Sequence, residues 1–498
     1  MSAETSPVTY GRRLADLARA EPEAIAVRYL AADGAETTLT RGALDRWANR
    51  LARWLESRGA TVGRWVVIAL PNEPLHLALA YGAWRTGAGV LPLSHRTPPL
   101  EAERILALVD AAVVIADWEL GHPALASRRD ALAADLLSDA PVVERVPTPS
   151  KAVASGGSTG SPKIIVDPNP WVERPGGLIE RYGRWTGVRA GQIQLGAGPL
   201  YHNAPFSWAH YGLFEEHELV LLERFDAGRA LDAIERHRVA WMCLVPTMMQ
   251  RMLREQRDRR RSLASLDGVF HTAAPCPAWV KRGWIDLVGA ERVFEAYGST
   301  EGIGACAIRG DEWLAHPESV GRPIHCDLEI RDAQGRRLPA GQVGEIFSRP
   351  HASAPTFRYL GATARLDGSG FGSVGDLGWL DGDGFLYLAD RRTDLIISGG
   401  VNVYPGEVEA ALSEHPGVRD VVVIGLPDPD WGRRVHAIVE PSDPAAPPGA
   451  SELSAWCRAR LAPPKRPKSF ELVPGLPRNE AGKIQRSALV RDRATSES

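Results

Sequence analysis

The stretch Ala154-Ser155-Gly156-Gly157-Ser158-Thr159-Gly160-Ser161-Pro162-Lys163 combines three glycines, several hydroxyl side chains and one lysine. Glycines allow close approach to the backbone, and successive N–H groups can form a nest for an anion. The hydroxyl groups add donors and Lys163 adds a positive charge. The stretch therefore predicts a polyphosphate-binding loop, with a flexible surface loop as the alternative. It is not a Walker A loop, because the spacing differs and Ile164 stands where a Mg²⁺-binding hydroxyl is needed.

Helical and strand patterns alternate on both sides of this loop. Apolar residues recur at helical spacing in some segments and form short continuous runs in others, which predicts βα units and a parallel sheet. Helices are expected at 42–58, 76–85 and 227–237, and strands at 65–70, 89–93, 110–116, 240–245, 269–272 and 292–295. The four charged residues 258–261 are expected to form a solvated helix end.

Two expected strands end in turns of small residues. Ala273-Ala274-Pro275 follows one of them, and Tyr297-Gly298-Ser299-Thr300-Glu301-Gly302 follows the other. Open α/β sheets bind ligands at such strand ends. These two turns are therefore candidate parts of a binding site.

Composition excludes several classes of protein. A chain of 498 residues with 44% hydrophobic content should hold two or more domains. Its net charge of −3 argues against a general nucleic-acid or membrane-surface protein. The five cysteines are scattered, which indicates neither a disulfide framework nor a zinc site and favours a reducing cytoplasm. No apolar run is long enough to span a membrane.

Five motifs in order along the chain resemble those of the adenylate-forming ligases, a family that includes acyl- and aryl-CoA synthetases, peptide-synthetase adenylation domains and firefly luciferase. They are the loop at 155–163, Tyr297-Gly298-Ser299-Thr300-Glu301, Gly375-Asp376-Leu377-Gly378, Asp390-Arg391-Arg392-Thr393-Asp394 with Ile397-Ser398-Gly399-Gly400, and Arg478-Asn479-Glu480-Ala481-Gly482-Lys483-Ile484.

The resemblance implies an α/β fold. A large N-terminal domain, residues 1–389, would contain parallel-type sheets with helices and a β-barrel-like part. A hinge at 390–393 would connect it to a small mobile α+β domain at 394–498, with a helix at 406–415 and strands at 420–425 and 436–440. Thr393 stands where the family usually has Asp or Lys at the hinge, which weakens that assignment.

The implied chemistry joins a carboxylate to the α-phosphate of ATP and releases pyrophosphate. By resemblance, Ser158, Thr159, Gly160 and Lys163 cradle the β- and γ-phosphates, Thr300 lies beside the α-phosphate and Glu301 ligates Mg²⁺. Lys483 stabilises the charge of the adenylating transition state. For the nucleoside, Tyr297 stacks on adenine with Ala273, Ala274, Glu295 and Ala296 around it, and Asp376 and Arg391 bind the ribose.

The acyl pocket and the acceptor are less defined by the resemblance. His202 would gate the pocket, and the wall would include Phe206, Trp208, Gly298, Ile303 and Gly304, with Gly298 and Gly304 leaving room for a bulky acid. Gly399 and Gly400 would line the channel of the incoming nucleophile. The loop and the segment 201–206 look most like bile-acid-CoA ligases and coronafacate-type ligases. Either CoA or an amino-acid amine could therefore accept the acyl group.

The alternatives outside the ligases are a luciferase-like oxygenase and an inactive acyl-binding module. Intact Lys483, Glu301 and Asp376 argue against the inactive form. The expected substrates are a small carboxylic acid and either CoA or an amino acid. The protein is expected to be a monomer or a homodimer. No nucleic acid is expected to bind.

Overall fold

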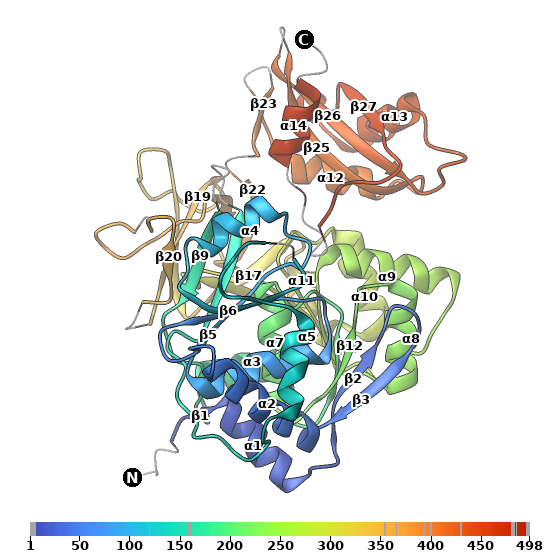
Figure 1. Ribbon diagram of the computed structural model, residues 1–498. Helices are drawn as coiled ribbons and strands as arrows, with labels where there is room; N and C mark the ends of the chain where they lie inside the picture. The colour runs from blue at the N-terminus through green and yellow to red at the C-terminus, as the bar shows by residue number, and fades with distance from the viewer. Residues whose placement is uncertain are drawn as a thin grey trace.

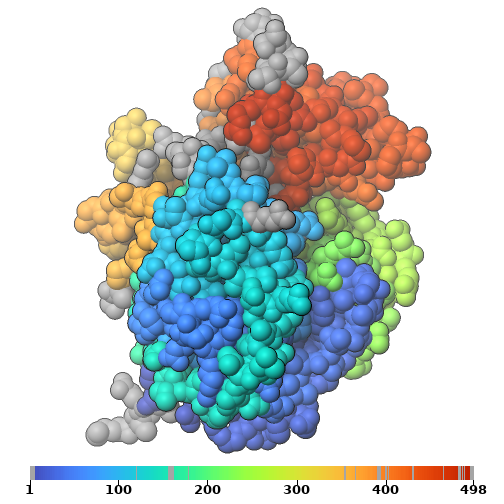
Figure 2. Space-filling model, viewed as in Figure 1, coloured from blue at the N-terminus to red at the C-terminus, as the bar shows by residue number. Residues whose placement is uncertain are grey.

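The computed structural model describes residues 6–494, apart from 119, 157–161, 353–354, 365, 392–393, 399–400, 429–430, 480–483 and 485. The chain forms a large N-terminal domain and a smaller C-terminal domain, drawn at the top of Figure 1. Figure 2 shows the smaller domain as a lobe seated on the larger one. In the described residues, no helix is long and apolar enough to cross a membrane.

The first large sheet has seven strands, in the order β20-β9-β8-β5-β4-β6-β7. Its bounds are β4 (Trp65–Ala69), β5 (Gly89–Pro92), β6 (Ala111–Ala116), β7 (Leu125–Ala126), β8 (Lys151–Gly156), β9 (Pro162–Asp167) and β20 (Arg358–Leu360). Alternate residues of β4 enter different cores: Val66 and Ile68 pack with α2 (Arg41–Glu56) and α3 (Pro74–Thr86), whereas Val67 packs with α4 (Pro99–Leu106). The continuous apolar run of β4 is thus explained by burial on both faces.

The second large sheet has thirteen strands, in the order β18-β19-β21-β22-β17-β16-β15-β14-β13-β11-β12-β2-β3. Its central part, β2 to β15, is parallel, and the strands from β15 outward to β18 pair antiparallel. The bounds are β2 (Ile25–Leu30), β3 (Glu36–Thr40), β11 (Ile193–Gly196), β12 (Glu218–Leu222), β13 (Trp241–Leu244), β14 (Gly268–Thr272), β15 (Val293–Gly298), β16 (Ala305–Arg309), β17 (Ser319–Ile324), β18 (Cys326–Arg331), β19 (Gly344–Pro350), β21 (Asp376–Leu380) and β22 (Leu386–Arg391).

Helix α7 (Asn203–Phe214) joins the two sheets. Phe206 and Ala209 pack into the core shared with α3, while Trp208 and Tyr211 pack with the aromatic face of the second sheet. On the other face of that sheet lie α8 (Ala227–His237), α9 (Pro246–Asp258) and α10 (Ala278–Val288). The remaining helices and strands of the large domain are α1 (Tyr10–Ala20), α5 (Arg128–Leu132), α6 (Leu178–Trp185), α11 (Gly310–Ala315), β1 (Val8–Thr9) and β10 (Val172–Glu173).

The C-terminal domain is α+β, with a separate core around β25 (Val418–Asp428) and β26 (Gly432–Pro441). Its other elements are β23 (Ile396–Ser398), β24 (Val401–Val403), α12 (Pro405–Ser413), α13 (Ala450–Arg460), β27 (Ser469–Leu472) and α14 (Arg486–Ala494). Arg254 of α9 donates to the carbonyl oxygens of Val418, at 2.8 Å, and of Arg419, and Trp279 Nε1 donates to Ser413 Oγ at 3.2 Å.

Two expectations from sequence are wrong. The strand expected at 292–295 continues to Gly298, because Tyr297 pairs with Cys306 and Gly298 with Ala305 across β16. The charged residues 258–261 do not form a uniformly solvated end, because Arg261 is buried and donates to Asp232, Glu255 and two backbone carbonyls.

Candidate active site

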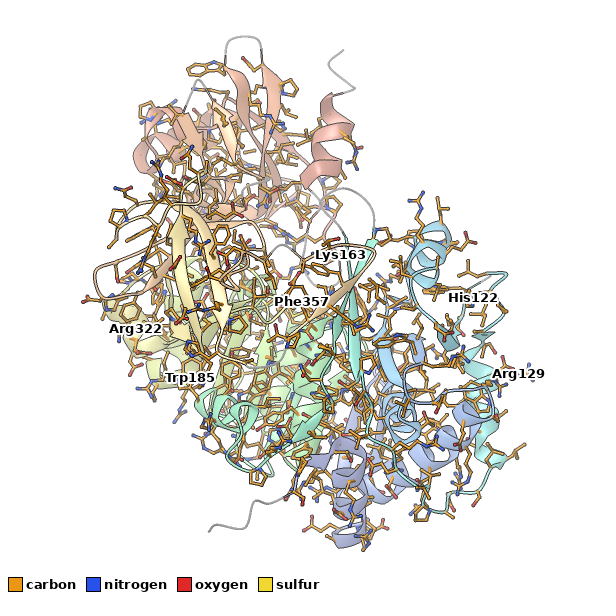
Figure 3. All side chains as sticks on the ribbon, turned by 90° about the vertical axis from the view of Figure 1, so that its left-hand side faces the viewer. His122, Arg129, Lys163, Trp185, Arg322 and Phe357 are labelled. Carbon is orange, nitrogen blue, oxygen red and sulfur yellow. The ribbon has the colours of Figure 1, made fainter. Side chains whose placement is uncertain are left out.

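A buried carboxylate, a lysine and a tyrosine meet between the two large sheets. Glu301 lies in the turn after β15, Lys163 on β9, and Tyr359 on β20, which pairs with β9. Lys163 Nζ lies 3.2 Å from Glu301 Oε1 and 3.0 Å from the Tyr359 hydroxyl, which itself donates to Glu301 Oε1 at 2.7 Å. Figure 3 shows Lys163 close to Phe357, beside the short strand that carries Tyr359.

The surroundings of Glu301 keep it ionised. Burial opposes its charge, but hydrogen bonds from Tyr359 and the backbone and the positive charge of Lys163 together lower the pKa of Glu301 below its usual value. The carboxylate is only 6% exposed. An ionised carboxylate at a strand end, with a cation beside it, can hold a divalent metal and a phosphate at the same place.

A single carboxylate at this place suits Mg²⁺ better than it suits a metal that is bound only by protein side chains. Mg²⁺ commonly takes one or two carboxylates and completes its shell with substrate phosphates and water. The described parts of the chain contain no cluster of three or more His, Cys, Asp or Glu side chains suited to a metal. Glu301, with the partly buried Thr300 before it, therefore fits a metal that arrives with a nucleotide.

A second pair of predicted residues also meets. The Tyr297 hydroxyl donates to Asp376 Oδ2 at 2.8 Å, joining the end of β15 to the start of β21. Ala273 and Ala274 are exposed at the end of β14, next to β15. Ala273 has φ +77°, a backbone conformation that residues with a side chain rarely adopt and that often marks a functional site. An aromatic ring, a carboxylate and two small residues thus border one edge of the sheet.

Three predicted site residues are placed differently from what we expected. The Glu295 carboxylate forms a buried ion pair with Lys281 of α10, so it does not face an open nucleotide slot. Phe206 is fully buried, 4.4 Å from His210 between ring centroids, and belongs to the core rather than to a pocket wall. A Cβ on Gly304 would lie 2.5 Å from Ser348 Cβ, so this glycine permits packing against β19 and does not enlarge a pocket.

The other predicted acyl residues lie near the start of α7 and the end of β15. Trp208 lines a narrow cavity with Gly198, Pro205 and Cys243. His202 is the N-cap of α7, and Ile303 is buried. Gly298 is exposed, and a Cβ added to it would make only ordinary van der Waals contacts. Ala296 is buried and packs with Phe270 and Trp208 in the aromatic cluster.

Several predicted residues lie outside the described part of the structure. They are Ser158, Thr159 and Gly160 of the loop, Gly399 and Gly400, Lys483, and the side chain of Arg391. Conversely, sequence reasoning does not identify Tyr359. Its only local signal is a short run of strand-forming residues at 357–360, and nothing in that run points to Glu301.

A larger hollow, of about 710 Å³, lies on the β18–β19 hairpin and is lined by Asp327, Glu329, Arg331 and Arg349 among others. None of the predicted site residues lines it. Several of its charges are paired with one another, as Arg349 is with Asp327 and Arg331 is with Glu329. The cluster around Glu301 is therefore the better candidate for chemistry.

Two family models and many curated relatives match this chain. The family model described as AMP-binding enzyme matches residues 14–356, and that of the AMP-binding enzyme C-terminal domain matches residues 407–483. A feruloyl-CoA synthase from Amycolatopsis sp. is 34% identical and is covered over 95% of its length by 94% of this chain.

Two solved structures cover nearly the whole chain. The amide bond synthetase McbA from Marinactinospora thermotolerans is 28% identical, with a TM-score of 0.78 over 97% of this chain and 98% of that one. An O-succinylbenzoate coenzyme A synthetase from Bacillus subtilis, solved with ATP and a magnesium ion, is 25% identical, with a TM-score of 0.78 over 97% and 99%. Both family models match in sequence order, and the first alone spans more than half of the chain, so the chain belongs to the AMP-binding enzyme family.

Proposed function

We propose that this protein is an ATP-dependent, AMP-forming ligase that activates a carboxylic acid as an acyl-adenylate and then transfers the acyl group to the thiol of CoA. The observation that carries the proposal is the contact of Glu301 with Lys163 and Tyr359, next to the Tyr297–Asp376 pair. ATP use follows from membership of the AMP-binding family. The relation to a feruloyl-CoA synthase supports CoA as the acceptor.

Each residue has a stated task in the first half-reaction. Ser158, Thr159, Gly160 and Lys163 cradle the β- and γ-phosphates, and Lys163 also offsets their negative charge. Glu301 holds Mg²⁺, which supplies charge neutralisation on the phosphates when it is bound, and Thr300 donates near the α-phosphate. Asp376 and Arg391 hold the ribose, and Tyr297 packs against adenine with Ala273, Ala274 and the Ala296 backbone. Lys483 stabilises negative charge as the carboxylate attacks the α-phosphorus and pyrophosphate leaves.

For the second half-reaction we propose rotation of the C-terminal domain about residues 390–393, so that Gly399 and Gly400 line the acceptor channel. His202, Trp208, Gly298 and Ile303 would border the acyl group. The protein would act in the cytoplasm on a small acid, with CoA as the second substrate and without nucleic acid.

An amine acceptor is the second candidate, favoured by the similarity to the amide bond synthetase McbA. Mass spectrometry of products distinguishes the two, with ATP and a panel of acids offered CoA and amino acids in parallel. We expect acyl-CoA as the main product with at least one acid. If the enzyme forms an amide and no acyl-CoA, the acceptor is an amine and not CoA. If none of the acids in the panel causes release of pyrophosphate, both proposed functions are excluded.

A further inference from the structure

Lys151 lies on the same face of the first sheet as Lys163. On β8, Ala152 and Ala154 pack into the core that contains α4, and on β9 Ile164 and Val166 do the same. Because successive side chains of a strand point to opposite faces, Lys151 and Lys163 both face the other way, toward α7 and the second sheet. Lys163 pairs with Ser155, four residues along β8 from Lys151, so the two lysines are separated by roughly 13 Å along the sheet.

The ammonium group of Lys151 is held by neutral partners. Its Nζ donates to Asn203 Oδ1 and to Ser207 Oγ, each at 2.7 Å, and lies 5.2 Å from the centroid of the Trp171 ring. Among the described residues, no carboxylate forms an ion pair with it. Its cross-strand neighbour Asp167 instead accepts hydrogen bonds from Asn169. An ammonium has three donors, and two of them are used here.

This lysine is enclosed by protein and yet reached by solvent. Burial lowers the pKa of Lys151 to about 8, although Asp167 opposes the shift. Lys151, Asn203 and Ser207 all keep part of their surface exposed. On α7, Asn203 and Ser207 form one row, and Ala204 and Trp208 form the row beside it, because residues four apart lie above one another on a helix. The side of α7 that holds Lys151 is thus next to the row that carries Trp208.

We propose that Lys151, positioned by Asn203 and Ser207, forms a subsite for an oxygen-bearing substituent, such as a second carboxylate or a phenolic oxygen, at the far end of the acid that is activated near Lys163. This inference rests on the proposed function and specifies its substrate class. Trp208, which is partly exposed and lines a narrow cavity with Gly198 and Pro205, offers an aromatic surface to an acid that carries a ring.

A purely structural role explains this arrangement less well. A neutral side chain could join β8 to α7 equally, whereas enclosing a cation without a carboxylate is unfavourable. Groups whose pKa is shifted by burial, as that of Lys151 is, are candidates for function. Protein acceptors use two of the three N–H groups of Lys151, which leaves the third for an oxygen of a substrate.

The test compares three acids that differ only at the far end: cinnamate, 4-hydroxycinnamate and 4-carboxycinnamate. For wild type we expect a kcat/KM for acid-dependent pyrophosphate release at least tenfold higher with one of the substituted acids than with cinnamate. Lys151→Met should reduce this ratio by about tenfold to 100-fold, the usual value of a hydrogen bond to a charged group. Lys151→Arg keeps the charge and should retain most of the ratio. Arg260→Met, at an exposed position, removes a positive charge elsewhere and should not change it.

Calorimetric titration of the same acids into the enzyme without ATP provides a readout that does not need turnover. If no acid drives pyrophosphate release but a substituted acid binds in a Lys151-dependent way, the subsite stands and the proposed function falls. Equal turnover of the three acids by wild type, or an equal loss with all three in Lys151→Met, would overturn the subsite while leaving the adenylating function intact. Absence of preferential binding and of preferential turnover would likewise overturn it.

Discussion

At the scale of single residues, the candidate site depends on how Glu301 is held. Its carboxylate accepts from Tyr359 and lies beside Lys163, so it is fixed before any substrate arrives. A preorganised charge does not have to reorient during the reaction, which is the main source of electrostatic catalysis. Tyr359 is not expected to touch substrate; it acts through Glu301.

Tyr359→Phe tests this role. The hydroxyl hydrogen bond helps to lower the pKa of Glu301, so its loss should raise that pKa and move the acid limb of the pH profile to higher pH. Activity that depends on ionised Glu301 is present above its pKa and is lost as the pH falls through it. The measurement is pyrophosphate release as the pH is lowered from neutral through the usual pKa of a glutamate, about 4.3, and below it. An acid limb that does not move would show that Tyr359 has no effect on Glu301.

Lys483→Ala tests the expected role of the lysine near the C-terminus. Removing one charge-stabilising donor should lower acid-dependent pyrophosphate release by roughly two or more orders of magnitude, about 3 kcal/mol. Transfer from a preformed acyl-adenylate should survive. Near-wild-type adenylation by this variant would remove Lys483 from the mechanism.

At the scale of elements, each helix and strand that the sequence predicts has a counterpart in the structure, but the local pattern misses other elements and does not show which strands pair. The helix 227–237 is confirmed at both ends. Glycine favours turns, so the sequence predicts a turn at Gly298, yet pairing with Ala305 extends β15 to it. Pairing between distant segments is absent from a local pattern, and this also explains why neither Tyr359 nor the buried position of Phe206 is predicted.

The end of α9 gives a second example with a measurable consequence. Arg261 is buried and donates to Asp232 and Glu255, so Arg261→Ala should lower the free energy of unfolding by about 2 kcal/mol. The neighbouring Arg260 is exposed, and Arg260→Ala should change the free energy of unfolding by less than about 0.5 kcal/mol. Denaturant unfolding of both variants gives the comparison. If the two variants have the same free energy of unfolding, the charged residues 258–261 are all solvated.

At the scale of the whole molecule, α9 and α10 hold the C-terminal domain in the arrangement of Figure 1. Arg254 contributes two of these contacts, to the carbonyls of Val418 and Arg419. Arg254→Ala should loosen the domain and increase the radius of gyration measured by small-angle X-ray scattering. Arg251→Ala, at an exposed position of the same helix, is the control. Identical scattering from all three proteins would show that these contacts do not determine the arrangement.

In the proposed reaction, Glu301 and its neighbours form the site that joins a carboxylate to AMP. The most direct measurement is the exchange of labelled pyrophosphate into ATP with a panel of carboxylic acids, in the absence of CoA and amines, for wild type and Glu301→Gln. We predict exchange by wild type only when an acid is present. In Glu301→Gln we predict strongly reduced exchange that needs a higher Mg²⁺ concentration, because hard cations prefer anionic oxygen ligands. Exchange without acid, or an unchanged rate and Mg²⁺ dependence in Glu301→Gln, would contradict the account.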